Sequence, residues 1–229
     1  MKIHKLLIVI GILFSFGWVV KNPNIEKDSV IKNNPVECDS AATIAQQIWD
    51  ESSFKAQISL EIFSLAMTGY YKYGIFNEGK ISIVDYSKPS SEKRFYVIDI
   101  AKKTLLFHTL IAHGKNTGEN NALHFSNESE SLKSSLGFFK TAETYAGKHG
   151  YSLRIDGLEK GLNDNARNRA IVIHGAKYVS EEFIKNQGRL GRSWGCPALP
   201  TSDTKDIIDA IPNGTCLFIY GYNKSDLKE

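Results

Sequence analysis

The chain has 229 residues, of which 42% are hydrophobic and 11% aromatic, and this composition is enough for one globular domain with an apolar core. Its formal net charge is +3, and its lysines and arginines neither form long blocks nor alternate with aromatic residues. Such a distribution gives no basic surface of the kind that binds nucleic acid, so we expect no nucleic-acid partner.

Residues 1–20 have the layout of a secretory signal. Two lysines precede an apolar run from Leu6 to Val20, and a polar stretch follows. The run is short for a membrane-spanning helix, which needs about 20 residues, and no A-x-A cleavage pattern follows it. A cleaved signal peptide and a membrane anchor both fit. We therefore expect an exported protein of the periplasm or cell envelope, either free or tethered to the inner membrane by its N-terminus.

Residues 21–38 are polar, contain two prolines and have no apolar periodicity, which is typical of a linker. The pattern then changes, because apolar residues recur at helical spacing in residues 39–49 and 55–74. A capping Asp or Ser begins the first of these segments, and glycine ends the second. We expect a helical segment at the start of a single domain that extends over residues 39–225.

After Gly79 the apolar residues follow a period of two, which is typical of β-strands. Strands are predicted at residues 80–87, 95–100, 104–112, 134–147, 151–158, 170–173 and 215–220. Short helices are predicted at 180–188 and 201–211. Because the strands are short and are not regularly interleaved with helices, we expect a mainly β fold, an antiparallel sandwich or barrel with a few peripheral helices.

The chain contains three cysteines, Cys38, Cys196 and Cys216. In an exported protein an odd number leaves at least one thiol unpaired or pairs it between chains. Cys216 lies in an apolar strand pattern, where it fits a small buried side chain, although a bridge to Cys38 is also compatible with the sequence. In either case Cys196 is the candidate for a free thiol.

Cys196 follows Gly195 in a turn, and Arg189 and Arg192 precede it. The reactive form of cysteine is the thiolate, and nearby positive charge favours it. The backbone N–H groups of residues 194–196 can point toward one position, as in an oxyanion hole. This pattern makes Cys196 a candidate nucleophile.

A histidine is the usual proton acceptor for such a thiol. His174 lies 22 positions before Cys196, at the end of a predicted strand, and His113 ends another strand beside a glycine, where we expect it to rim the same site. A zinc site formed with His149 is one alternative, but spacings such as CxxC or HExxH are absent, so we expect no metal and no cofactor. A buried structural thiol with a structural histidine is the other alternative.

The segments IVIHGAKYVS and GRLGRSWGCPALP together resemble the His-Gly and Ser-x-Gly-Cys signature of the bacterial L,D-transpeptidase catalytic domain, which has the YkuD-type fold, and its exported murein subgroup. The resemblance extends over residues 55–222. It implies a β-rich sandwich with a Cys–His site that remodels peptidoglycan.

By this resemblance Cys196 attacks the carbonyl between a diamino acid residue and the terminal D-alanine of a peptidoglycan stem peptide. D-alanine leaves and a thioester remains, which an amine of a neighbouring stem converts to a 3→3 cross-link. His174 would be the base, and the carbonyl of Gly175 would hold its ring. Ser193 occupies the hydroxyl position of the motif, and Gly195 matches it directly.

Two positions depart from the family pattern. Trp194 stands where the motif has a second histidine, so any role of that histidine is absent. The residues after Cys196 are PALP instead of a polar or basic residue, so Arg192 or Arg189 would bind the substrate carboxylates. The alternatives are an L,D-carboxypeptidase or amidase with another acyl acceptor, and a non-catalytic wall-binding module of the same fold.

Overall fold

The computed structural model describes residues 38–74, 76–77, 79–211 and 213–223. The predicted signal peptide or anchor at residues 1–20 lies outside these ranges, as does the linker apart from its last residue. Within the described ranges, no helix is both long and apolar enough to cross a membrane.

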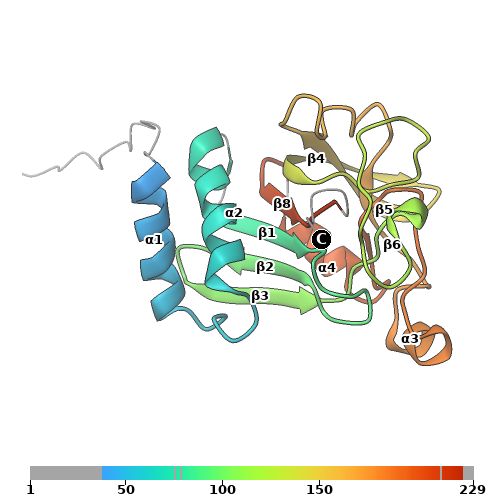
Figure 1. Cartoon of the computed structure of the whole chain (residues 1–229), viewed down its shortest axis with the longest axis horizontal. Coiled ribbons are helices and arrows are strands. Elements are labelled where there is room, and N and C mark those ends of the chain that lie inside the picture. The colour runs from blue at the N-terminus through green and yellow to red at the C-terminus, as the bar shows by residue number, and fades with distance from the viewer. Residues whose placement is uncertain (1–37, 75, 78, 212, 224–229) are drawn as a thin grey trace, which may run out of the picture. The chain divides into compact units, whose positions relative to one another are not determined.

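Eight strands form one curved sheet (Figure 1). They are β1 (Lys80–Asp85), β2 (Phe95–Asp99), β3 (Thr104–Thr109), β4 (Gly137–Gly147), β5 (Gly150–Gly157), β6 (Val172–Gly175), β7 (Ala198–Leu199) and β8 (Cys216–Tyr220). Their order across the sheet is β3-β2-β1-β8-β4-β5-β6-β7. The β1–β8 and β6–β7 pairs are parallel and the other neighbours are antiparallel. The predicted mainly β fold is confirmed, and it contains two parallel pairs that we did not expect.

The two edges of the sheet meet. Beyond the end of β3, Ala112 forms an antiparallel bridge with Ala198 of β7, with N–H to O distances of 2.9 and 3.3 Å. A second bridge joins Gly114 to Ser193, just before β7. The sheet therefore nearly closes on itself, and the closure holds the segment after β3 against the loop that contains Cys196.

Four α-helices lie at the periphery. They are α1 (Cys38–Glu51), α2 (Leu60–Tyr73), α3 (Glu181–Gln187) and α4 (Thr204–Ala210), and a 3₁₀ turn, η1 (Lys115–Thr117), follows β3. Figure 1 shows α1 and α2 side by side next to β1, β2 and β3. Helix α2 begins at residue 60, later than predicted, because the Ser59 hydroxyl caps it by accepting the N–H of Ile62 at 3.3 Å.

The sheet has an apolar cluster on each of its faces. Phe63 and Met67 of α2 pack with Ile83 of β1 in one cluster, while Val84 of β1 and Ile173 of β6 belong to the other. Successive side chains of a strand point to opposite faces, so β1 contributes to both clusters. The second cluster also contains Ile207 and Ile208 of α4. This second cluster anchors β6 and therefore fixes the position of His174, which follows Ile173.

Candidate active site

Cys196 lies in a loop between α3 and β7 that the closure of the sheet holds in place. The N–H of Ser193 donates to the carbonyl of His113 at 3.0 Å, and the carbonyl of Ser193 accepts the N–H of Lys115 at 2.8 Å. The Ser193 hydroxyl donates to the carbonyl of Cys196 at 2.6 Å and accepts the N–H of Gly195 at 3.1 Å. Ser193 therefore shapes the turn that carries the thiol.

The turn requires a glycine immediately before the cysteine. Gly195 has a φ of 127°, a conformation that other residues rarely adopt, and a Cβ atom there would lie 2.9 Å from the carbonyl oxygen of Lys133. Its N–H is already bound to the Ser193 hydroxyl. The oxyanion hole expected from this turn can therefore use at most the N–H groups of Trp194 and Cys196.

The Cys196 side chain is half-buried, and its thiol donates to the carbonyl of Ala170, with an Sγ–O distance of 3.7 Å. Ala170 lies two residues before β6 and has a φ of 53°, which is uncommon for alanine. This backbone conformation is not that of a strand, so β6 begins later than predicted. Burial raises the pKa of the Cys196 thiol, while the N–H of Val172 and the guanidinium of Arg169 act in the opposite direction. The resting group at neutral pH is thus a thiol, whereas we expected neighbouring arginines to favour the thiolate.

His174 lies in β6, and only 2% of it is exposed. Its Nδ1 atom lies 3.0 Å from the carbonyl oxygen of Gly175. A carbonyl can only accept, so this contact places the ring proton on Nδ1 and leaves the lone pair on Nε2. The parallel pairing of β6 and β7 sets His174 opposite Ala198, two residues after Cys196. Burial lowers the pKa of His174, so the ring is neutral at pH 7.

The pair therefore combines a neutral thiol with a neutral imidazole whose Nε2 can accept a proton. This combination favours general-base activation, in which the proton leaves Sγ as the sulfur attacks, over a preformed thiolate–imidazolium pair.

These features can be compared with those of known proteins. A family model described as the L,D-transpeptidase catalytic domain matches residues 54–220. The chain belongs to this enzyme family. A comparison with curated proteins finds no match.

Several solved structures of L,D-transpeptidases are similar at low identity. The enzyme from Mycobacterium smegmatis is 13% identical with a TM-score of 0.38, over 62% of this chain and 59% of that chain. The helical cell shape determining protein Pgp2 from Campylobacter jejuni is 14% identical with a TM-score of 0.44, over 65% and 50%. The enzyme from Stackebrandtia nassauensis is 16% identical with a TM-score of 0.38, over 81% and 78%. The chain thus spans less than two thirds of the length of the first two proteins.

In this L,D-transpeptidase domain, the arginines that we expected to bind substrate carboxylates are paired with a carboxylate of the chain itself. Arg192 Nη1 lies 2.7 Å and Arg189 Nε 2.9 Å from the two carboxylate oxygens of Glu119. Arg192 also donates to the carbonyl of Gly118 at 3.2 Å. Binding a substrate carboxylate here would require Glu119 to be displaced.

Arg169 is the cation that acts on the thiol, and the sequence analysis missed it. Its Nη1 donates to Ser126 O at 2.7 Å and Ser135 Oγ at 2.6 Å, and its Nη2 to Lys133 O at 2.6 Å and Ser131 Oγ at 3.2 Å. All four acceptors are neutral oxygens, so they do not cancel its charge. Its place in RNRAIVIHG, five residues before His174, was the available signal.

We predict that Arg169→Met slows the alkylation of Cys196 by iodoacetamide at pH 8 by roughly threefold to tenfold, because an opposite charge near a thiol lowers its pKa by about one unit or more. The rate of alkylation measured against pH gives the thiol pKa directly. Arg169→Lys keeps the charge and should restore most of the rate, which separates the charge from the loss of hydrogen bonds.

Arg192→Met is the matched control, because Glu119 already compensates this charge. It should leave the alkylation rate nearly unchanged. A loss of rate in Arg192→Met as large as in Arg169→Met would contradict the assignment.

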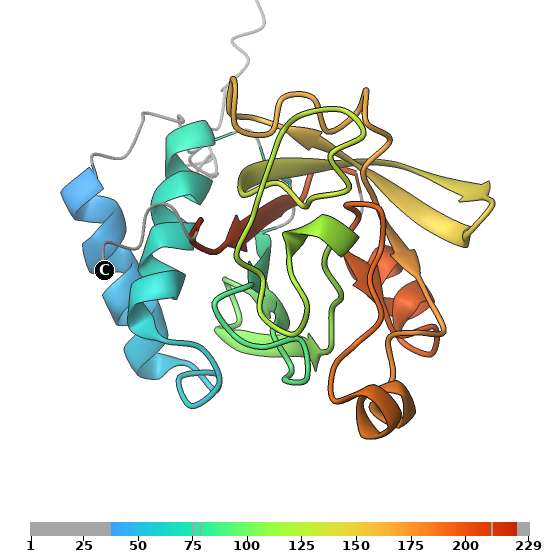
Figure 2. The same ribbon diagram turned by 45° about the vertical axis from the view of Figure 1, so that its right-hand side comes forward.

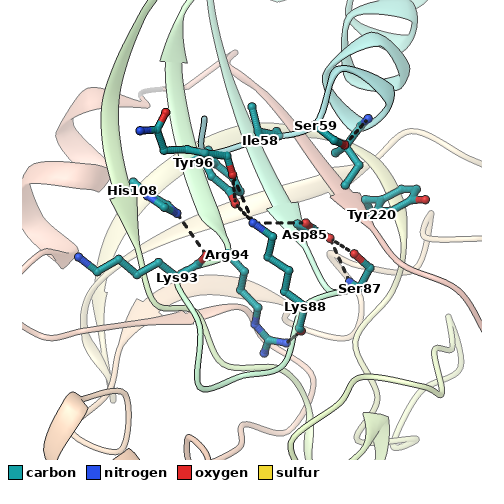
Figure 3. Close-up of polar contacts among 12 residues, drawn as sticks. Ile58, Ser59, Asp85, Ser87, Lys88, Lys93, Arg94, Tyr96, His108 and Tyr220 are labelled. Carbon is teal, nitrogen blue, oxygen red and sulfur yellow. Dashed lines mark hydrogen bonds and ion pairs between the residues drawn. The ribbon is translucent and has the colours of Figure 1, made fainter. Parts of the chain in front are cut away.

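His113 lies beneath the loop and not at its rim, where we expected it. It is 0% exposed; its Nδ1 accepts from Arg94 Nη2 at 2.8 Å, and its Nε2 donates to the carbonyl of Gly118 at 3.2 Å. Arg94 also donates to Ile111 O and, as Figure 3 shows, to the carbonyl of Lys88. With both nitrogens occupied, the His113 ring supports the backbone that holds Ser193 and is closed to substrate.

The burial of His113 predicts a loss of stability in acid. Burial, reinforced by the charge of Arg94, lowers the pKa of His113 from 6.5 to about 3. Between these values the unfolded chain binds a proton that the folded chain does not, so the free energy of unfolding should fall as pH falls, by up to about 1.4 kcal/mol per pH unit from this group. Urea denaturation between pH 7 and pH 4 measures the slope. His113→Gln should show a shallower slope, and an unchanged slope would contradict the assignment.

Lys148 and His149, the two residues of the β4–β5 turn, contact residues of the candidate site. The ring of His149 stacks on that of His174, with centroids 4.4 Å apart, and Lys148 Nζ lies 5.4 Å from the centroid of the Trp194 ring. His149 thus has a partner here that is not a metal ion. Throughout the part of the chain that the structure describes, no three His, Cys, Asp or Glu side chains are placed to bind a metal ion.

Proposed function

We propose that the chain is an exported cysteine acyltransferase that remodels peptidoglycan, with Cys196 as the nucleophile and His174 as its base. The observation that carries this proposal is the placement of two neutral groups. His174 at the end of β6 lies opposite Ala198, two residues after Cys196, and the contact of its Nδ1 with Gly175 O leaves the lone pair on Nε2. Family membership supports the substrate class, a peptidoglycan stem peptide. The apolar run at residues 6–20 supports export.

In the acylation step, Sγ of Cys196 attacks the carbonyl carbon before the terminal D-alanine, and its proton passes to Nε2 of His174. The bond between this carbon and the D-alanine nitrogen then breaks, and the nitrogen takes the proton from Nε2. D-alanine leaves with a neutral amine, and the acyl group stays on sulfur as a thioester.

In the second step an amine of a neighbouring stem attacks the thioester and gives a proton to His174. The C–S bond breaks, and the proton returns to sulfur. The same cycle with water would give trimming, which is the L,D-carboxypeptidase alternative. Transfer to an amine is favoured because the family is that of transpeptidases.

Three elements of the site would assist both steps. The Arg169 charge lowers the free energy of the thiolate as it forms, and the N–H groups of Trp194 and Cys196 can donate to the developing oxyanion. Ser193 holds the turn in the conformation that presents them. The carbonyl of Gly175 stabilises the imidazolium that forms on His174 by accepting its Nδ1 proton.

The test is mass spectrometry of the protein and of its products after incubation with purified tetrapeptide muropeptides. We expect a transient acyl adduct on Cys196, free D-alanine and cross-linked dimers. Shortened monomers without dimers would favour the hydrolytic alternative. If the folded, reduced protein sediments with sacculi but forms no adduct and no product, the wall-binding alternative is correct and the proposed function is wrong.

A further inference from the structure

The β4–β5 hairpin extends beyond the rest of the sheet (Figure 2). Two side chains of its turn contact residues of the candidate site. Gly147 and Gly150 are the last paired residues, and Gly150 has a φ of 77°, which suits a tight turn. The two residues between them, Lys148 and His149, are exposed. We call residues 147–150 the hairpin tip.

The tip makes two ring contacts with the site. His149 lies against His174 at a centroid distance of 4.4 Å and an interplanar angle of 26°, so the rings are nearly parallel. Lys148 lies over the indole of Trp194, which is 73% exposed. Consecutive residues of the tip therefore touch the base and a neighbour of the nucleophile.

His174 has one hydrogen bond to hold its ring, from Nδ1 to Gly175 O. A single bond fixes one atom but leaves the plane of the ring free to tilt. Its partners in the sheet are Ser152 of β5 and Ala198 of β7, which do not titrate, and Thr204 of α4 lies near Gly175. A flat ring packed against one face of the imidazole restricts that tilt.

We propose that His149 is a positioning residue for His174, in which the stacked ring of His149 holds the imidazole plane so that Nε2 faces the thiol of Cys196. The proposal rests on the proposed function for the role of His174. It assigns to the hairpin tip a part in the reaction that the sequence motif does not contain.

The stack has a consequence for pH. His174 must become an imidazolium when Cys196 gives up its proton, and a second positive charge on His149 opposes this. His149 acts on His174 in this direction, lowering the pKa of the His174 ring alongside the larger effect of burial. The Cys196 thiol, which the proposed reaction pairs with this ring, is uncharged at neutral pH. Removing the charge on His149 should therefore raise the pKa of His174 and move the acid limb of the activity to higher pH.

The experiment compares His149→Ala, which removes the ring, with His149→Phe, which keeps a flat ring but cannot be protonated. Three quantities are measured between about pH 5 and pH 9, the range in which histidines titrate. They are the rate of Cys196 alkylation by iodoacetamide, kcat and KM for D-alanine release from tetrapeptide muropeptides, and the pKa of His174 by NMR. His124→Ala is the control, since this exposed histidine lies on another loop.

We expect His149→Ala to lower kcat by roughly tenfold with little change in KM, a smaller loss than removal of the base itself would give. His149→Phe should retain most of the activity above neutral pH, raise the pKa of His174 and shift the acid limb to higher pH. His124→Ala should match the wild type. If His149→Ala has the kcat and the acid limb of the wild type, or if His149→Phe loses as much as His149→Ala, the proposal is overturned.

The readouts separate this proposal from the proposed function. Alkylation and NMR need no muropeptide, so a wild type that forms no acyl product, with an alkylation rate that falls in His149→Ala and is largely kept in His149→Phe, would keep the positioning role and reject the function. A wild type that forms product, with superimposable profiles for all variants, would keep the function and reject the positioning role.

Discussion

Cys196→Ala is expected to abolish covalent modification by a carbapenem, while the wild type gains the mass of one molecule. The reason is chemical, because the acyl group needs a nucleophile that can lose its proton to His174, and alanine has none. Turnover of muropeptides should fall by at least about 10⁴-fold, since the nucleophile acts as a unit with its base. Intact-protein mass spectrometry after incubation with the drug gives the answer.

Cys216→Ala is the matched control. Cys216 is a free thiol in β8, it is 0% exposed, and burial raises its pKa well above its usual value. Among the side chains that the structure describes, Cys216 therefore forms no disulfide. Cys216→Ala should keep the adduct, although loss of a buried side chain will cost some stability. An adduct that persists in Cys196→Ala and disappears in Cys216→Ala would assign the chemistry to the wrong thiol.

Arg94→Leu is expected to lower the free energy of unfolding by about 3–5 kcal/mol, the usual cost of breaking a buried charged network. Arg94 is 0% exposed and donates hydrogen bonds to the carbonyls of Ile111 and Lys88 and to Nδ1 of His113. Leucine would leave all three acceptors buried without a donor. Urea denaturation measures the loss.

Arg154→Leu is the control for Arg94→Leu, because both arginines lie over a tyrosine ring, Arg154 over Tyr145 at 4.6 Å and Arg94 over Tyr86 at 4.8 Å. Arg154 is one-third exposed and pairs with a surface carboxylate, so its loss should cost less than about 1 kcal/mol. Arg94→Leu should also raise the pKa of His113 and make stability less dependent on pH. Equal losses in the two variants would show that the buried network does not stabilise the loop.

His113 and Ser193 link Arg94 to the turn that contains Cys196. Arg94 holds the ring of His113, the backbone of His113 holds Ser193, and Ser193 shapes the turn of Cys196. A change at Arg94 therefore reaches the thiol through three contacts. In the residual folded protein, Arg94→Leu should slow alkylation of Cys196, whereas Arg154→Leu should not.

Much of the fold could be predicted because its signals are local. Apolar residues at a period of two placed the strands from Lys80 onward, and capping residues placed the helices to within a few positions. The shifts have local causes that a pattern of polarity does not encode. Ala170 adopts a positive φ and delays β6, and the cap at Ser59 makes α2 begin five residues after its predicted start at residue 55.

The sequence by itself also determined the family and supplied the two groups that we propose to react. Cys196 and His174 were selected by residue type and by the glycine beside each, and these are properties of the sequence. The tertiary structure decided their state and their helpers. Burial of the thiol in the folded chain raises its pKa.

Folding also pairs Arg192 with Glu119 and leaves Arg169 to act on the thiol, while the β4–β5 turn sets His149 on His174. These contacts join residues 25 or more positions apart in the sequence. A local pattern of apolar residues therefore does not predict which of several cations or histidines lies at the site. Burial and distance, which exist only in the folded chain, set the strength of a charge and hence the chemistry of the pair.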